Sequence, residues 1–154
     1  MAKQTDPETA RKRAWLSRYK ESLVEQKRLA ETLQELRSRS TSISAPLPGA
    51  RSAPTGFHSD RVANSVQQIA DTEQRLQAEQ IRGADVAAEI INAAFTQLPL
   101  NHAQVLVFQY IDLLNADQTA RKINLCKNTV MGYRSAALAA LKLPEGSTIP
   151  PSEI

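Results

Sequence analysis

The stretch between residues 121 and 134 concentrates side chains that suit contact with nucleic acid. Amide, ammonium and hydroxyl groups form hydrogen bonds with base edges in a DNA major groove, and methionine adds apolar contact. The residues of this kind at the expected start of a helix are Lys127, Asn128, Thr129 and Met131. The cations that suit backbone phosphates are Arg121, Lys122 and Arg134. The pattern predicts a DNA-reading helix whose N-terminus adds backbone N–H groups for phosphates.

A tight turn, KINLCKNTV at residues 122–130, precedes this helix. Ala120 is small enough for the next helix to cross there, and Val130 supplies a buried side chain. Asn124 tolerates the left-handed backbone that such a turn needs. Cys126 stands at the N-cap, where a thiol is a poorer acceptor than a serine hydroxyl, and we interpret it as a partly buried structural thiol. The pattern favours a helix-turn-helix, with an ordinary corner of a helical bundle as the alternative.

No residue pattern in the chain indicates catalysis. There is no Ser/His/Asp arrangement, phosphate-binding loop or paired-carboxylate motif. His58 and His102 lack Cys or carboxylate neighbours at metal-ligand spacing. We therefore predict a protein that is not an enzyme and that uses no metal and no cofactor.

Three short helices must position the candidate contacts. The first begins at Pro99, and the second begins at Asn115, where Gln118 can complete a capping box. The third runs from about residue 127 to 141 and ends before Pro144, since proline cannot continue a helix.

Longer helices are expected upstream. Residues 8–37 contain neither Pro nor Gly, and apolar residues such as Leu16, Leu23 and Leu33 recur at helical spacing, which predicts one amphipathic helix. A second helix begins near residue 59 or 60, with an apolar face that includes Val62 and Val66, and we expect Gly83 to kink or divide it.

The predicted fold is therefore all-α. It consists of a long helical hairpin or coiled coil over 1–97 with a Ser/Pro-rich linker at 38–59, a helix-turn-helix domain over 98–143, and a disordered tail over 144–154. The long helices predict a homo-oligomer, most simply a dimer, although pairing within one chain and pairing between chains are both open.

Charge is distributed unevenly. The net charge is +3, and residues 99–143 carry five Lys/Arg against two Asp/Glu, which suits a polyanionic partner. The cluster Arg11, Lys12 and Arg13 is interpreted as a solvated helix face. The polar start and the short apolar runs predict a cytoplasmic protein without a membrane span.

The segment from Leu98 to Leu141 resembles region 4 of sigma-70 factors, without a gap. The residues that carry the resemblance are Leu98, Pro99, Leu106, Phe108, Tyr110, Thr119, Ala120, Ile123, Cys126, Thr129, Val130, Ala137, Leu138 and Leu141. Five positions depart from the family pattern. Ala103 and Gln109 stand where arginines are common, and Leu113 replaces a common glycine before the second helix. Asn124 replaces the usual turn glycine, and Cys126 replaces the usual serine at the start of the third helix.

The layout of the whole chain is similar to phage and prophage regulators of the ArpU/RinA-like type. This resemblance implies a sequence-specific, double-stranded DNA-binding regulator of late phage genes, with RNA polymerase as a candidate partner. No upstream segment resembles the sigma regions that bind the polymerase core, which favours an accessory activator over a complete sigma factor. The alternatives are a small terminase-like DNA-recognition protein and a coiled-coil scaffold that binds no DNA.

Overall fold

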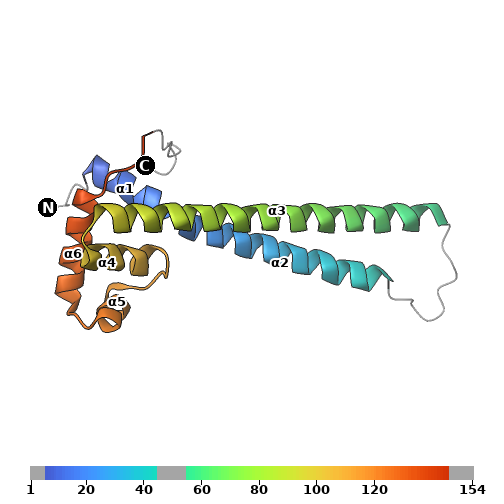
Figure 1. Cartoon of the computed structure of the whole chain (residues 1–154). Helices are drawn as coiled ribbons and strands as arrows, with labels where there is room; N and C mark the ends of the chain where they lie inside the picture. Colours follow the sequence, from blue (N-terminus) through green and yellow to red (C-terminus); the bar gives the residue numbers. More distant parts are fainter. Residues whose placement is uncertain (1–5, 45–54, 146–154) are drawn as a thin grey trace. The chain divides into compact units, whose positions relative to one another are not determined.

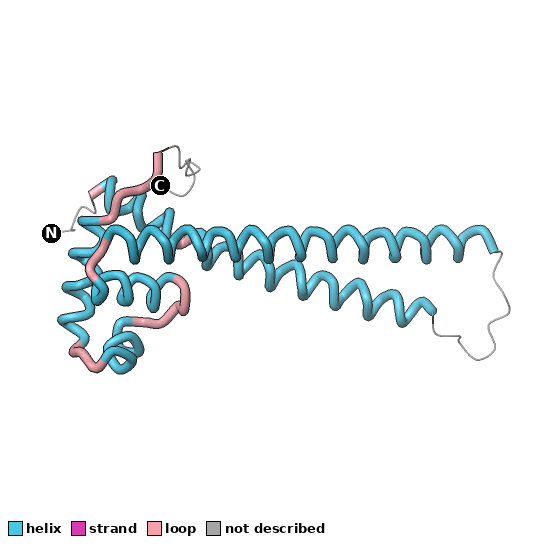
Figure 2. The backbone as a smooth tube through the Cα atoms, viewed as in Figure 1, coloured by secondary structure: helices cyan, strands magenta, loops and turns pink. Residues whose placement is uncertain are grey.

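The computed structural model describes residues 6–44 and 55–145, apart from the side chains of 42–44 and 55–60, and this part of the chain is helical without any strand (Figures 1 and 2). The predicted all-α class is confirmed. The helices are α1 (Pro7–Leu16), α2 (Arg18–Ser44), α3 (Thr55–Gln97), α4 (Leu100–Tyr110), α5 (Ala116–Ile123) and α6 (Lys127–Ala140).

Two compact units make up the chain. The first comprises Met1–Glu21 and Gly83–Ile154, and the second comprises Ser22–Arg82. The expected helix-turn-helix segment, 98–143, is thus one part of the first unit, which also takes in α1 and the end of α3. Three short helices offer little interior of their own, so the additional helices supply buried surface.

The main core of the first unit shows why those helices are needed. Trp15 and Leu16 of α1 are buried, as are Val86 and Ile90 of α3. They share one cluster with further buried residues of α3, α4, α6 and the adjoining segments: Ala94, Leu98, Ala103, Leu106, Ala137, Leu138 and Leu141. Burial of these apolar side chains is the dominant favourable contribution to folding of this unit.

The helix expected over residues 8–37 is interrupted at Ser17, so that prediction was wrong in this respect. The Ser17 N–H donates to the Arg13 carbonyl at 2.9 Å as the C-cap of α1. Arg18 opens α2, and its Nε donates to the Trp15 carbonyl at 3.0 Å. Its guanidinium lies 4.8 Å from the centre of the Trp15 ring, in cation–π range. Arg18 thus satisfies a backbone group at the end of α1 that the spacing of apolar residues could not reveal.

Lys12 corrects the interpretation of the N-terminal basic cluster as a solvated face. Its side chain is buried, and Nζ donates to the Ala139 carbonyl at 3.3 Å. Nζ also lies 3.2 Å from Glu8 Oε1. Lys12 belongs to α1, but its ammonium lies at the C-terminal end of α6. There it satisfies a carbonyl and interacts favourably with the negative end of the helix dipole. Arg11 and Arg13 are exposed, so the three cations do not act alike.

The second unit contains polar as well as apolar contacts between α2 and α3. Leu29 and Leu33 are buried, and so is Ser22, whose hydroxyl donates to the Glu79 carbonyl at 3.3 Å. Arg37 Nη2 lies 2.6 Å from Glu73 Oε1 at an exposed position. Because later residues of α2 meet earlier residues of α3, the two helices are antiparallel and pair within one chain in this unit.

The helices extend into both ends of the predicted linker at 38–59. α2 continues to Ser44 and α3 begins at Thr55, while residues 45–54 lie outside the described part. The Thr41 hydroxyl donates to the Arg37 carbonyl at 2.9 Å, which shows how a hydroxyl residue is accommodated within a helix. Serine and threonine therefore did not end α2 where the composition suggested.

Gly83 does not divide α3 into two elements, because the helix runs through it. Of the residues expected on the apolar face of this helix, Val62 and Val66 are 46% and 59% exposed, whereas Ile69 and Leu76 are half-buried. The predicted tail at 144–154 is described only for Pro144 and Glu145, and its remainder lies outside the described residues.

None of the helices in the described part has the length and apolar character needed to cross a membrane.

Candidate nucleic-acid interface

α5 begins with the predicted capping box. The Gln118 N–H donates to Asn115 Oδ1 at 2.8 Å, and the Asn115 N–H donates to Gln118 Oε1 at 3.0 Å. The Thr119 hydroxyl, which is fully buried, donates to the Asn115 carbonyl at 2.8 Å. The two bonds between Asn115 and Gln118 satisfy backbone donors that a helix start otherwise leaves unpaired. The start of α5 is therefore fixed by its own sequence.

The turn between α5 and α6 has the predicted left-handed residue. Asn124 is the C-cap of α5 with φ 55° and ψ 43°, and its N–H donates to the Ala120 carbonyl. The Leu125 N–H donates to the same carbonyl at 3.0 Å. Asparagine is among the few residues that occupy this backbone region routinely. Glycine is thus not required at this corner.

A small apolar cluster holds α5 and α6 at this turn. Val105 of α4, Ala120 of α5 and Val130 of α6 are buried together. The partly buried side chains around them are Ile123, Leu125 and Tyr133. The burial predicted for Ala120 and Val130 is confirmed, and this cluster fixes which side of α6 faces inward.

The turn before α5 contains a second left-handed residue, Leu113, with φ 58°. For a residue with a Cβ this conformation costs roughly 1–2 kcal/mol. The next residue, Leu114, donates its N–H to the Phe108 carbonyl at 2.9 Å. The backbone here suits glycine, although the sequence places a leucine.

The four predicted base-contacting residues differ in accessibility. Lys127 and Asn128 are exposed, and Met131 is 50% exposed. Thr129 is half-buried, and its Oγ1 lies 2.9 Å from Cys126 Sγ. Three of the four are thus available on the outer side of α6, while Thr129 is engaged at the helix start.

The outer side of α6 continues with small residues. A Cβ added at Gly132 would meet no atom within 4 Å, so this glycine has open space in front of it. Ser135 is exposed and lies one heptad after Asn128, which places both on the same face. Ser135 was missed in the sequence, although the seven-residue spacing could have indicated it. Small side chains on this face leave the α6 backbone accessible.

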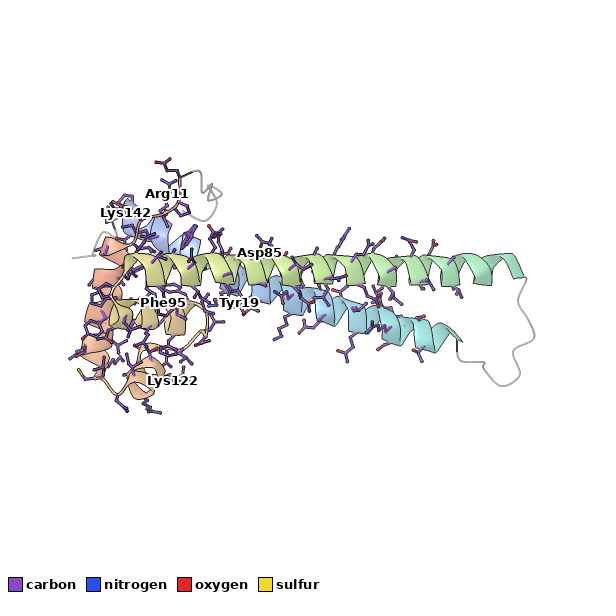
Figure 3. All side chains as sticks on the ribbon, in the orientation of Figure 1. Arg11, Tyr19, Asp85, Phe95, Lys122 and Lys142 are labelled. Atoms are coloured by element: carbon purple, nitrogen blue, oxygen red, sulfur yellow. The ribbon has the colours of Figure 1, made fainter. Side chains whose placement is uncertain are left out.

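The three predicted phosphate-contacting residues also differ in accessibility. Arg121 and Lys122 are exposed in the last turn of α5, and Figure 3 shows Lys122 on that helix. Arg134 is half-buried, with Nη2 donating to the Tyr110 hydroxyl at 3.2 Å and the guanidinium 5.8 Å from the Tyr110 ring centre. Arg134 therefore joins α6 to α4, and a phosphate would have to share or replace that contact.

One carboxylate lies beside the candidate contacts. Asp117 Oδ2 is 3.7 Å from Lys127 Nζ, and both side chains are more than half exposed. An exposed ion pair of this kind contributes at most about 1 kcal/mol. The Lys127 ammonium can therefore exchange this partner for a polyanion at little cost.

Cys126 is the N-cap of α6 but forms no capping hydrogen bond with its side chain. It is exposed, which corrects its interpretation as a partly buried thiol. The hydroxyl of Thr129 is the main cause that lowers the pKa of the thiol below its ordinary value, because a hydrogen bond favours the thiolate.

Two residues that depart from the sigma-like pattern, Ala103 and Gln109, each place side-chain atoms in the interior. Ala103 is fully buried in the main core, where an arginine would be poorly accommodated. Gln109 Oε1 is buried and has no hydrogen-bond partner in the described part of the chain.

His102 packs against Tyr133, with 4.9 Å between ring centres. The described residues contain no cluster of His, Cys, Asp and Glu suited to a metal ion.

Comparisons with protein-family models, with curated proteins and with solved structures found no match. The similarity to sigma region 4 and to ArpU/RinA-like regulators therefore stays a prediction from the residues.

Proposed function

We propose that this protein binds double-stranded DNA through α5 and α6 and regulates transcription, as an accessory factor of the phage or prophage type. The observation that carries the proposal is the exposed start of α6. Lys127, Asn128 and Met131 are accessible there, open space lies in front of Gly132, and the opposite side of α6 is buried against α4 and α5. These groups can form hydrogen bonds and apolar contacts with base edges in a major groove.

The groups that would bind DNA phosphates lie at the end of α5 and at the start of α6. Arg121 and Lys122 are exposed beside the turn. The backbone N–H groups at the start of α6 and the positive end of its dipole also favour anions. Such contacts fix the position of the protein on DNA without reading its sequence.

A dimer would place two copies of α6 on two half-sites, which predicts a repeated or palindromic site. RNA polymerase is the protein partner that the accessory role implies.

The test begins with selection of bound genomic fragments, followed by measurements on a selected site and on an unrelated duplex. Asn128→Ala and Lys127→Ala should each reduce discrimination between the two duplexes, by about 1–3 kcal/mol for a lost bidentate base contact. Arg121→Ala should weaken binding to both duplexes similarly and reduce the slope of log K against log salt by about 0.9.

Lys142→Ala is the matched control, because Lys142 is an exposed cation of the same unit whose backbone bonds to the side chain of Gln97. It should leave both affinities unchanged. If Asn128→Ala and Lys127→Ala leave affinity and sequence preference unchanged, the groove assignment is wrong. A wild-type protein that binds no duplex would instead favour a scaffold.

A further inference from the structure

The outward side of α3 in the first unit carries an apolar stripe that the core does not use. It consists of Ala84, Ala88, Ile91 and Phe95, all exposed. Ile91 is 36% exposed and Phe95 is 44% exposed. The steps of four, three and four residues are those of a coiled-coil seam. Figure 3 labels Phe95 and, next to the start of the stripe, Asp85.

The residues of α3 that pack in the core of the unit lie on a different side of the helix. Val86, Ile90 and Ala94 are buried with α1, α4 and α6. A helix on the surface of a soluble domain normally has one apolar face and an opposite charged face. α3 therefore has more apolar surface in this segment than packing within the unit requires.

Charge is sparse beside the stripe. On its two flanks stand Asp85 and Asn92 on one side and Ala87 and Ala94 on the other. The nearby Glu89 is paired with Arg18, at 3.2 Å between carboxylate and guanidinium. Depletion of charge around an apolar centre is characteristic of a protein interface.

We propose that this stripe binds the same stripe of a second copy of the chain, with the two α3 helices antiparallel. In antiparallel pairing about the centre of the segment, Ala84 meets the partner's Phe95 and Ala88 meets the partner's Ile91. The two-fold axis repeats both contacts, as in any isologous interface. Every layer then combines one small and one large side chain, which fills the space between the helices evenly.

Parallel pairing fits the same residues less well. It would place Phe95 against the partner's Phe95 and Ala84 against the partner's Ala84, so that some layers are crowded and others leave voids. Antiparallel pairing also brings Asp85 near the partner's Asn92 without opposing like charges. Size and charge thus select a second copy of this helix in one orientation.

The interface is short, because it has only four layers. Stable protein interfaces bury about 800 Å² on each partner, and this seam alone is expected to bury less. We therefore expect a reversible dimer with a dissociation constant of about 1 μM or weaker. The dimer does not rest on DNA binding, so it is measured without DNA.

Sedimentation equilibrium of the full chain over a range of concentrations tests the proposal. The wild type should change from monomer to dimer mass, whereas Ile91→Asp should remain monomeric over the whole range with an unchanged helical circular dichroism spectrum. Leu100→Asp is the matched control, because Leu100 is a 63% exposed apolar residue outside the stripe, and it should dimerise as the wild type does.

Disulfide trapping tests the orientation. In a Cys126→Ser background, mixing Asp85→Cys chains with Asn92→Cys chains should give a mixed disulfide dimer. Parallel helices would keep these flanking positions on opposite sides of the seam and give none. The proposal is overturned by a wild type that stays monomeric, by a larger assembly, by a dimer that Ile91→Asp leaves intact, or by absence of the mixed disulfide.

Discussion

The two helices of the candidate DNA-binding turn are held in place by different means. α5 begins with reciprocal hydrogen bonds between Asn115 and Gln118 and ends at a left-handed asparagine. Cys126 precedes α6 as its N-cap, but its side chain forms no capping bond, and the helix contains Gly132. Burial of Val130, Ala137 and Leu138 compensates for these weak local signals.

A helix can therefore begin with a weak cap where its buried side is well packed. Local signals fix α5, which positions the turn, whereas tertiary packing fixes α6, which presents the candidate base contacts. The start of α6 is then free to carry residues that favour recognition over helix formation.

The largest expected effect comes from removing the packing that fixes α6. Val130→Ala deletes buried apolar atoms and leaves a cavity, and it should lower the free energy of unfolding by about 2 kcal/mol. Urea denaturation measures the change. Val24→Ala makes the same substitution at a 61% exposed position and should change stability by less than about 0.5 kcal/mol. Equal losses in both variants would contradict packing as the main constraint on α6.

A smaller effect distinguishes the two helix caps. Asn115→Ala should cost about 1 kcal/mol, because it removes a side chain that satisfies a backbone donor of α5. Cys126→Ala should cost much less, and Cys126→Ser should increase stability by up to about 1 kcal/mol by supplying a better cap. Thermal denaturation of the three variants measures the order. A stability loss in Cys126→Ser would show that the thiol already stabilises α6.

The smallest effect concerns the charge at the start of α6. The Thr129 hydroxyl lowers the pKa of the Cys126 thiol, so iodoacetamide should react with the native protein at a lower pH than with the unfolded chain. Since the folded pKa is the lower one, the thiolate contributes stability above the unfolded pKa, and this contribution is lost as pH falls through the folded pKa.

Thr129→Val should move the alkylation midpoint up toward the ordinary cysteine value, whereas Thr129→Ser, which keeps the hydroxyl, should not. Identical midpoints for the wild type and Thr129→Val would show that the hydroxyl has no such effect.

Sequence reasoning succeeded where the cause is local. The capping box at Asn115, the left-handed Asn124 and the start of α6 at Lys127 follow from residue types at fixed spacings. The burial of Ala120 and Val130 followed because the turn geometry leaves few alternatives.

It failed where residues distant in sequence meet. Lys12 reaches the Ala139 carbonyl, which turns a cation expected on a solvated face into a structural one. Arg134 reaches the Tyr110 hydroxyl, a contact that the sequence did not indicate. The break at Ser17 was missed for a local reason, because the Arg18 side chain bonds to the carbonyl of Trp15, only three residues away. Helical periodicity contains no information about such partners.

The placement of Trp15 has a practical spectroscopic consequence. It is the single tryptophan of the chain, it is 1% exposed, and its ring lies under the Arg18 guanidinium in the core of the first unit. Its fluorescence emission should therefore shift to longer wavelength when that core opens and water reaches the indole. Circular dichroism, by contrast, sums the helices of both units. Recording the two signals on one sample would show whether the units unfold together or in sequence.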